Sequence, residues 1–222
     1  EEDITKLIAN NPFDLMFDNI FVDEGQDWPN NEIFLLNKIY KANQINVADG
    51  EDQYVRGKKA FWHNYSTNIM QKTRKLKKCL RMKENLTKFV SELANSFGVN
   101  EWDLEPNIEA SGGRVVIYEG DMTKNTNIYL NFKDEAKRLG NYPVDLLACV
   151  PPSFMVNYND SKISKIGKLY QELNIKVWDG TSDLVRKEFC KDRDALRIVQ
   201  YDSSRGLEGW IVFNYEMDEF WN

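Results

Sequence analysis

The sequence predicts an α/β fold organised around a mostly parallel sheet, and two observations support this. Short runs of apolar and β-branched residues recur along the chain, each bounded by turn-forming residues. Between them lie segments of about 10 to 15 residues whose apolar side chains fall at helical spacing. Strands and helices that alternate at these lengths are typical of βαβ units, in which helices connect parallel strands.

The N-terminal part of the chain contains two predicted strands with a helix between them. The run "LMFDNIFV", Leu15–Val22, is almost continuously apolar and predicts a buried strand. After Pro29, a helical pattern covers "NNEIFLLNKIYKA". The second strand is "INVA", Ile45–Ala48, and it ends at the turn pair Asp49 and Gly50.

The C-terminal part repeats this pattern more completely. A helix that ends at Gly98 carries apolar residues at helical spacing, namely Leu86, Phe89, Val90, Leu93, Ala94 and Phe97. The strands predicted after it are Arg114–Tyr118, Asp145–Val150, Ile175–Trp178, Leu196–Tyr201 and Trp210–Tyr215. Helices are expected around "NIYLNFKDEAKRLG", "KISKIGKLYQELN" and "SDLVRKEFC".

The predicted strands stop between Lys58 and Leu76, where positive charge accumulates, and this predicts a domain boundary. Residues 1–70 would be the C-terminal part of one domain, because two strands are too few for a complete α/β sheet. Residues 71–222 would form a second, nearly complete α/β domain. The chain is therefore expected to be an excised piece of a longer protein.

Composition narrows the possible functions. No apolar run approaches the ~18–20 residues that span a membrane, so no membrane partner is expected. His63 is the only histidine, which excludes a multi-histidine zinc site. The three cysteines form no CxxC pair, and this favours a reducing, cytoplasmic compartment. The net charge of −6 argues against a protein that binds nucleic acid through its overall charge.

One stretch departs from this acidic average. Residues 56–83 contain ten lysine and arginine residues and no aspartate or glutamate. Such a run is either a solvated helix face or a strip that contacts phosphate groups, and the sequence leaves both interpretations open.

A group of carboxylates directly follows the first predicted strand, in "FVDEGQDWPNNE". Ligands of parallel sheets bind at the carboxyl ends of the strands. There, Asp23 could order Mg²⁺ while Glu24 polarises an attacking water. An ordinary loop start would have the same composition. A metal-dependent nuclease using Asp23, Glu24 and Asp27 is another alternative, although the sequence offers no convincing catalytic lysine for it.

Three further stretches follow in order: "VADGEDQYVRG" at 47–57, "LRMKENL" at 80–86 and "SSRGLEGW" at 203–210. Together with "VDEGQD", they resemble the superfamily 1 helicases of the UvrD/Rep type over nearly the whole chain. "VDEGQD" is similar to the Walker B motif of these helicases. The other three are similar to their motifs III, IV and V.

The resemblance implies a fold and a chemistry. The fold would be RecA-like, of the P-loop NTPase type, with an incomplete first domain at the N-terminus. The intact protein would couple ATP hydrolysis to movement along single-stranded DNA, or RNA. Asp23 would coordinate Mg²⁺, Glu24 would be the general base, and Gln53 would sense the γ-phosphate. Arg56 and Arg81 would reach the phosphates and neutralise the charge that develops during phosphoryl transfer.

Other residues are implied to bind the nucleotide or the nucleic acid. Gln26, Gly206 and Glu208 would belong to the nucleotide site. Gly206 is also expected to have a positive φ, because a tight turn between two strands favours glycine there. The residues expected near the nucleic-acid strand are Tyr54, Ser203, Ser204 and Arg205.

The sequence departs from the family at several positions. Val55 stands where a tryptophan is usual, which leaves Tyr54 to stack on a base. Gln200 and Asp202 replace the usual threonine and histidine of motif V, and the Asp202 carboxylate would repel a phosphate backbone. These changes favour an alternative in which the protein is a nucleotide switch or binding module that does not translocate.

The Walker A loop, GxxxxGK[ST], does not occur in the sequence. The rest of the same polypeptide is therefore expected to carry it. By itself the chain is expected not to hydrolyse ATP, because the β- and γ-phosphates are normally held by that loop and its lysine.

Overall fold

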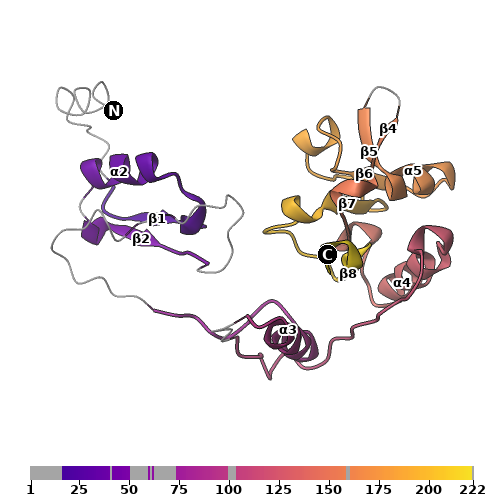
Figure 1. The fold of residues 1–222 in the computed structure, drawn as a ribbon, viewed down its shortest axis with the longest axis horizontal. Coiled ribbons are helices and arrows are strands. Elements are labelled where there is room, and N and C mark those ends of the chain that lie inside the picture. The colour runs from indigo at the N-terminus through magenta and orange to yellow at the C-terminus, as the bar shows by residue number, and fades with distance from the viewer. Residues whose placement is uncertain are drawn as a thin grey trace. The chain divides into compact units, whose positions relative to one another are not determined.

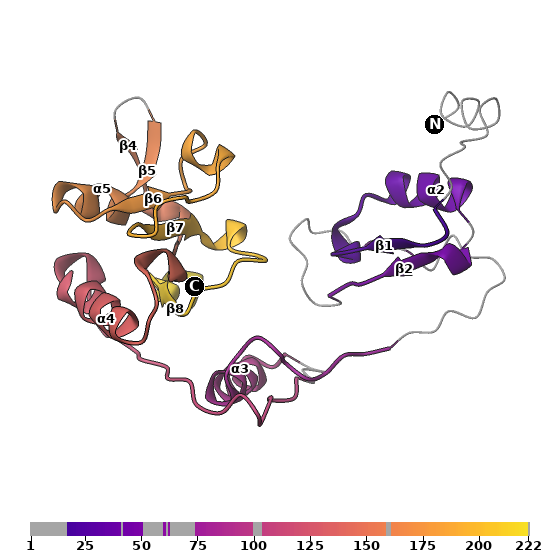
Figure 2. The ribbon, with the colours of Figure 1, turned by 180° about the vertical axis from the view of Figure 1, so that it is seen from behind.

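The computed structural model describes residues 17–40, 42–50, 60, 62, 74–99, 104–158 and 161–221. They form a mixed α/β structure, as predicted. The chain divides into two compact units, residues 1–111 and 112–222 (Figure 1, Figure 2). The predicted boundary between residues 70 and 71 falls outside the described residues and stays a prediction.

The first unit contains a short parallel sheet. Strand β1 (Ile20–Val22) pairs in parallel with β2 (Ile45–Val47), and Ile20 lies opposite Ile45. Helix α2 (Asn30–Ile39) begins directly after Pro29 and connects the two strands. The predicted order of strand, helix and strand is therefore confirmed.

This small sheet is buried on one face. Val22, Ile33 and Trp62 form its core, with Ile20, Trp28, Leu36, Ile45, Val47 and Ala60 packed around them. Phe21, in the middle of β1, is 80% exposed, so the run predicted as a buried strand is covered on one side only. The strand also begins five residues later than expected, at Ile20, and residues 15 and 16 lie outside the described residues.

Helix α3 (Glu84–Ser96) follows in the same unit and confirms the predicted helix. Its amino end is fixed by the backbone N–H of Glu84, which donates to the carbonyl of Ala110 at 2.9 Å. Thr87 and Ala94 are buried on one side of the helix. Gly98, with φ of 69°, lies just beyond its last turn, where a left-handed residue ends a helix.

The second unit is built on a four-stranded sheet in which every pair is parallel. Its strands are β3 (Leu146–Val150), β6 (Val177–Asp179), β7 (Leu196–Gln200) and β8 (Ile211–Asn214), in the order β6-β7-β3-β8. All four were predicted from their apolar runs. The parallel arrangement of the predicted fold class is therefore confirmed in this unit.

Helices α4 (Asn127–Arg138) and α5 (Lys165–Glu172) contribute to the main core of this sheet. Alternate residues of β3 divide between the two faces, because side chains of a strand alternate. Leu146, Ala148 and Val150 join the core with the helices, whereas Leu147 and Cys149 join Val199 in a smaller cluster.

One predicted strand is absent. Residues 114–118 have no strand pairing, and their apolar side chains are largely exposed. Instead, the Arg114 guanidinium pairs with the Glu135 carboxylate of α4 at 2.7 Å and lies over the Phe132 ring at 5.4 Å. The β-branched composition of this segment therefore does not lead to strand pairing, and the segment contacts α4 instead.

Two predicted helices also differ. The one expected from Lys162 begins at Lys165, because Ser161–Ser164 form strand β5, which pairs antiparallel with β4 (Met155–Tyr158). The Ser164 hydroxyl caps α5 by accepting from the Gly167 N–H at 2.9 Å, and this fixes where the helix begins. The helix expected over "SDLVRKEFC" is reduced to a single 3-10 turn, Val185–Lys187.

Further 3-10 turns occur at Gly25–Asp27, Ala42–Gln44, Met122–Lys124, Pro143–Asp145, Pro152–Phe154, Tyr201–Ser203 and Met217–Trp221. Within the part of the chain that the structure describes, no helix has both the length and the apolar character needed to cross a membrane.

Candidate functional site

The predicted catalytic carboxylates lie where β1 ends, beside the end of β2. The Ala48 N–H donates to the Val22 carbonyl and the Gly25 N–H donates to the Ala48 carbonyl, both at 2.8 Å. These bonds extend the parallel pairing past the strands. As expected from the sequence, Asp23 and Glu24 therefore stand at the carboxyl end of parallel strands, where ligands of such sheets bind.

Glu24 adopts an unusual backbone conformation. Its φ of 52° and ψ of 44° place it in the left-handed region, which is uncommon for residues other than glycine. Its N–H donates to Asp23 Oδ1 at 2.9 Å, and both side chains are exposed. Strained residues of this kind cluster at functional sites, so the conformation supports a hypothesis of function at this turn.

Gln26 connects Glu24 to the loop after β2. Its side chain is 4% exposed; Nε2 donates to Glu24 Oε2 at 2.7 Å, and Oε1 accepts from the Gly50 N–H at 2.8 Å. Gln26 was expected at the nucleotide site, and the structure gives it a positioning contact with the predicted base. The motif "DEGQD" indicated Gln26 as a site residue, but it did not predict that its partners are Glu24 and Gly50.

Gly25 shows why this turn packs so closely against β2. A Cβ atom at this position would overlap the Val47 side chain. The Gly25 carbonyl also accepts from the buried indole N–H of Trp62 at 2.8 Å. The Gly25 N–H therefore holds the turn to the end of β2 at Ala48, and its carbonyl holds the turn to Trp62 in the core.

Gln53, Tyr54 and Arg56 fall within residues 51–59, outside the described residues, so their roles stay predictions. Arg81 is exposed and lies three residues before the start of α3, which agrees with the predicted arginine before a helix. Its role at a phosphate also stays a prediction.

The motif V-like residues lie in the connection between β7 and β8. Gly206 has φ of 73°, which confirms its predicted positive φ. The connection differs from a tight strand-to-strand turn, because β7 and β8 flank β3 on opposite sides and both run parallel to it. It must therefore return from the carboxyl end of β7 to the amino end of β8.

This connection separates the predicted residues. The Ser204 hydroxyl donates to the Tyr201 carbonyl at 2.8 Å, just past the carboxyl end of β7. The Glu208 carbonyl instead accepts from Arg197 Nη2 at 2.5 Å, and the same guanidinium donates through Nε to the Val144 carbonyl at 2.6 Å. Because Val144 precedes β3, Glu208 lies near the amino ends of the strands, away from Ser203 and Ser204. Arg205 lies between these two groups and is half-buried.

The carboxyl end of this second sheet is acidic. Asp202 accepts from the Ser203 hydroxyl at 3.1 Å. Burial raises the pKa of Glu216, and the carboxylates of Asp218, Asp121 and Glu219 raise it further. Asp202 lies beside Ser203, and its carboxylate would repel a phosphate group near Ser203 and Ser204.

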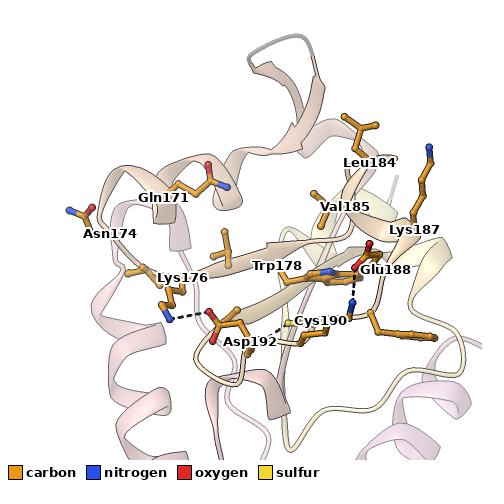
Figure 3. A pocket seen from close by; sticks show the side chains of 15 residues that line it. Gln171, Asn174, Lys176, Trp178, Leu184, Val185, Lys187, Glu188, Cys190 and Asp192 are labelled. Atoms are coloured by element: carbon orange, nitrogen blue, oxygen red, sulfur yellow. Dashed lines mark hydrogen bonds and ion pairs between the residues drawn. The ribbon is translucent and has the colours of Figure 1, made fainter.

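A pocket of the second unit is lined by none of the predicted site residues that the structure describes. It has a volume of about 840 Å³ and borders β6, the edge strand of the sheet. Figure 3 shows Trp178 near its middle, with Lys176 and Asp192 at one end and Leu184 and Lys187 at the other. The Lys176 ammonium contacts the Asp192 carboxylate at 3.0 Å, and this bond raises the lysine pKa. The other lining residues are Gln171, Asn174, Ile175, Val177, Val185, Glu188, Phe189, Cys190, Lys191 and Ala195.

Within the described residues, no group of three or more His, Cys, Asp or Glu side chains is placed to hold a metal ion. This does not conflict with Mg²⁺ at Asp23, since Mg²⁺ is usually bound by one or two carboxylates together with substrate phosphates and water. Comparisons of the chain with protein families, with functionally characterised proteins and with solved structures give no match.

Proposed function

We propose that the chain is part of a superfamily 1 helicase-like ATPase that couples ATP hydrolysis to movement along single-stranded DNA or RNA. The observation that carries the proposal is the position of Asp23 and Glu24 at the carboxyl end of two parallel strands. Glu24 is there in a left-handed conformation, and its carboxylate is oriented by a buried glutamine. The order of the four motif-like stretches in the sequence supports the same class.

In this proposal both units belong to RecA-like domains of the P-loop NTPase type. The all-parallel sheet of the second unit supports this. The Walker A loop would be contributed by another part of the same polypeptide. A cytoplasmic location is proposed with this function and is supported by the three cysteines, which are all free thiols.

Glu24 would act as the general base. It would accept a proton from the water that attacks the γ-phosphate of ATP. The hydrogen bond from Gln26 to Glu24 Oε2 restricts rotation of the carboxylate, which reduces the entropic cost of aligning it with the water. Asp23, exposed beside it, would hold the Mg²⁺ that accompanies ATP; bound there, the cation neutralises charge on the phosphates.

Gln26 also suggests how the site communicates with the motif III-like stretch. Its Oε1 atom accepts from the N–H of Gly50, and the predicted Gln53 and Arg56 follow only a few residues later in the chain. A change in this loop on loss of the γ-phosphate would alter the same side chain that orients Glu24. This link would let hydrolysis and strand binding influence each other.

The alternative of a nucleotide switch that does not translocate is favoured by one observation. The carboxyl end of the second sheet carries Asp202 and Glu216, where a strand-binding motif V would need to accept phosphates. The nuclease alternative receives less support, because Asp23, Glu24 and Asp27 do not form a three-carboxylate metal group among the described residues.

The test is Glu24→Gln in the polypeptide that carries this chain together with its Walker A loop. Turnover of ATP should fall by about 10²-fold or more, the scale of a lost general base, while ATP affinity stays within a few-fold. Glu32→Gln is a matched control, since Glu32 is exposed in the first turn of α2. Turnover near wild type in Glu24→Gln would exclude Glu24 as the base. Stimulation of turnover by oligothymidylate, without movement along it, would favour the switch.

A further inference from the structure

The feature that carries a further inference is the basic segment, defined as residues 74–83. Six of its ten residues are cationic, namely Arg74, Lys75, Lys77, Lys78, Arg81 and Lys83, and none is acidic. All six side chains are exposed. In a chain whose net charge is −6, the segment is a local reversal of charge.

The backbone of the basic segment is held in place although its cationic side chains are exposed. Lys78 forms a parallel β-bridge with Glu105. The Glu105 N–H donates to the Lys77 carbonyl at 2.8 Å, and the Cys79 N–H donates to the Glu105 carbonyl at 2.9 Å. The segment leads directly into α3, which begins at Glu84. Cations on a fixed backbone lose less entropy when they bind a partner than cations on a flexible chain.

One acidic neighbour of the segment is Glu109. The Lys78 ammonium lies 3.9 Å from the Glu109 carboxylate, and that carboxylate is largely exposed. A solvent-exposed ion pair of this length is weak and is screened further by salt. With six cations and no acid of its own, the segment has a net positive charge.

Two exposed leucines lie among the cations. Leu76 is 91% exposed and Leu80 is 75% exposed. A partner with charged and apolar parts would contact both kinds of residue. A nucleic-acid single strand is such a partner, since it has a regular row of phosphates and unpaired bases.

We propose that the basic segment binds the sugar-phosphate backbone of single-stranded nucleic acid, with Leu76 and Leu80 against its bases or sugars. The choice of partner rests on the proposed function, because an anionic membrane or an acidic peptide would match the same charge. Asp202 lies beside Ser203, and its carboxylate would repel phosphates near Ser203 and Ser204, so a strand-binding surface is expected elsewhere. The basic segment would bind the strand in their place.

The experiment measures binding of the 222-residue chain to a fluorescent oligothymidylate of about 20 nucleotides, by anisotropy at several salt concentrations. The test variant combines Arg74→Gln, Lys75→Gln and Lys77→Gln, which spares Arg81 because of its proposed role at ATP. Loss of three phosphate contacts should lower the slope of log K against log salt by about 2, and weaken binding by about 10- to 100-fold at 0.1 M salt.

Two control variants isolate the contribution of position from that of charge. Lys137→Gln, Arg138→Gln and Lys187→Gln remove three exposed cations from the other unit and should leave affinity and slope unchanged. Arg74→Lys, Lys75→Arg and Lys77→Arg keep the charge of the basic segment and should retain binding. Circular dichroism of all three variants should match wild type, because every substituted side chain is exposed.

An unchanged slope in the test variant, or no binding of oligothymidylate by the wild type, would overturn the proposal. Binding to phosphatidylcholine vesicles with about one third phosphatidylserine, without oligothymidylate binding, would instead identify a membrane surface. Binding to polyglutamate alone would identify an acidic protein partner. The assay contains no ATP, so its failure is distinct from a failure of the Glu24 test.

Discussion

Gln26→Glu is the substitution that best tests how Glu24 is positioned. It preserves the size of the side chain, and it keeps an oxygen to accept from the Gly50 N–H. At the other end it replaces the Nε2 donor with a second carboxylate oxygen, 2.7 Å from Glu24 Oε2 if nothing moves. One hydrogen bond to a charged group is lost, and a repulsion between two carboxylates is gained.

The magnitude follows from these two changes. A hydrogen bond to a charged group contributes about 1.5–3 kcal/mol, and about 1 kcal/mol is a reasonable value here because Glu24 is exposed. Two like charges 2.7 Å apart repel by about 1.5 kcal/mol in water and about 6 kcal/mol near a protein surface. Because Glu24 is exposed and can turn outward, the low end of this range applies. We therefore expect the free energy of opening of this turn to fall by about 2–3 kcal/mol at neutral pH.

Hydrogen–deuterium exchange of peptides that cover residues 20–28 and 45–50 measures this opening directly. Exchange should be about 30- to 150-fold faster in the variant at pH 7, since each 1.36 kcal/mol changes the rate about tenfold. The effect should shrink as the pH falls, because protonation of one carboxylate restores a donor between the two. Gln171→Glu, at an exposed position of α5, is the matched control and should show no such change.

Two results would contradict the proposed contact. Equal exchange in Gln26→Glu and wild type at pH 7 would mean that Gln26 does not hold Glu24. Faster exchange that is independent of pH would mean that the variant disturbs the core around Trp62 and that carboxylate repulsion is not the cause.

Two further predictions concern the second unit. Tyr129 Oη is buried and has no hydrogen-bond partner among the described residues, whereas Tyr170 Oη and Tyr215 Oη lie 3.1 Å apart. In urea denaturation, the free energy of unfolding of Tyr129→Phe should therefore be about 1 kcal/mol higher than that of wild type. That of Tyr170→Phe should be about 1–2 kcal/mol lower. A destabilised Tyr129→Phe would indicate that Tyr129 has a partner such as a buried water. Burial raises the pKa of Cys149 to about 11. Maleimide should therefore label Cys149 far more slowly in the native protein than in urea, and the native rate should rise with pH up to about 11. Equal labelling rates in the native and the urea-unfolded protein would show that Cys149 is an accessible thiolate.

The sequence by itself determined the features that depend on local periodicity and on single-residue conformational freedom. Strand β3 was predicted from its unbroken apolar run, and α3 from its helical stripe with Gly98 beyond it. The positive φ of Gly206 followed from the absence of a Cβ atom. The position of Asp23 and Glu24 at a strand end followed in the same way, because a carboxylate pair directly after an apolar run marks where that run stops.

Tertiary contacts decided the features that depend on residues distant in the sequence. Residues 114–118 have the composition of a strand, but Arg114 pairs with Glu135 and the segment forms no ladder. The Asp179 carboxylate at the end of β6 accepts from the Ser164 N–H and hydroxyl, and these contacts help to fix the position where β5 ends and α5 begins.

The same holds for the candidate site. The partners of Gln26 are Glu24 and Gly50, and the second of these is brought near only by the parallel pairing of β1 with β2. Glu208 is separated from Ser203 and Ser204 because β7 and β8 flank β3, which forces their connection to cross from one end of the sheet to the other. Strand order is set by which apolar faces pack together across the whole unit, and short-range sequence patterns carry no information on that choice.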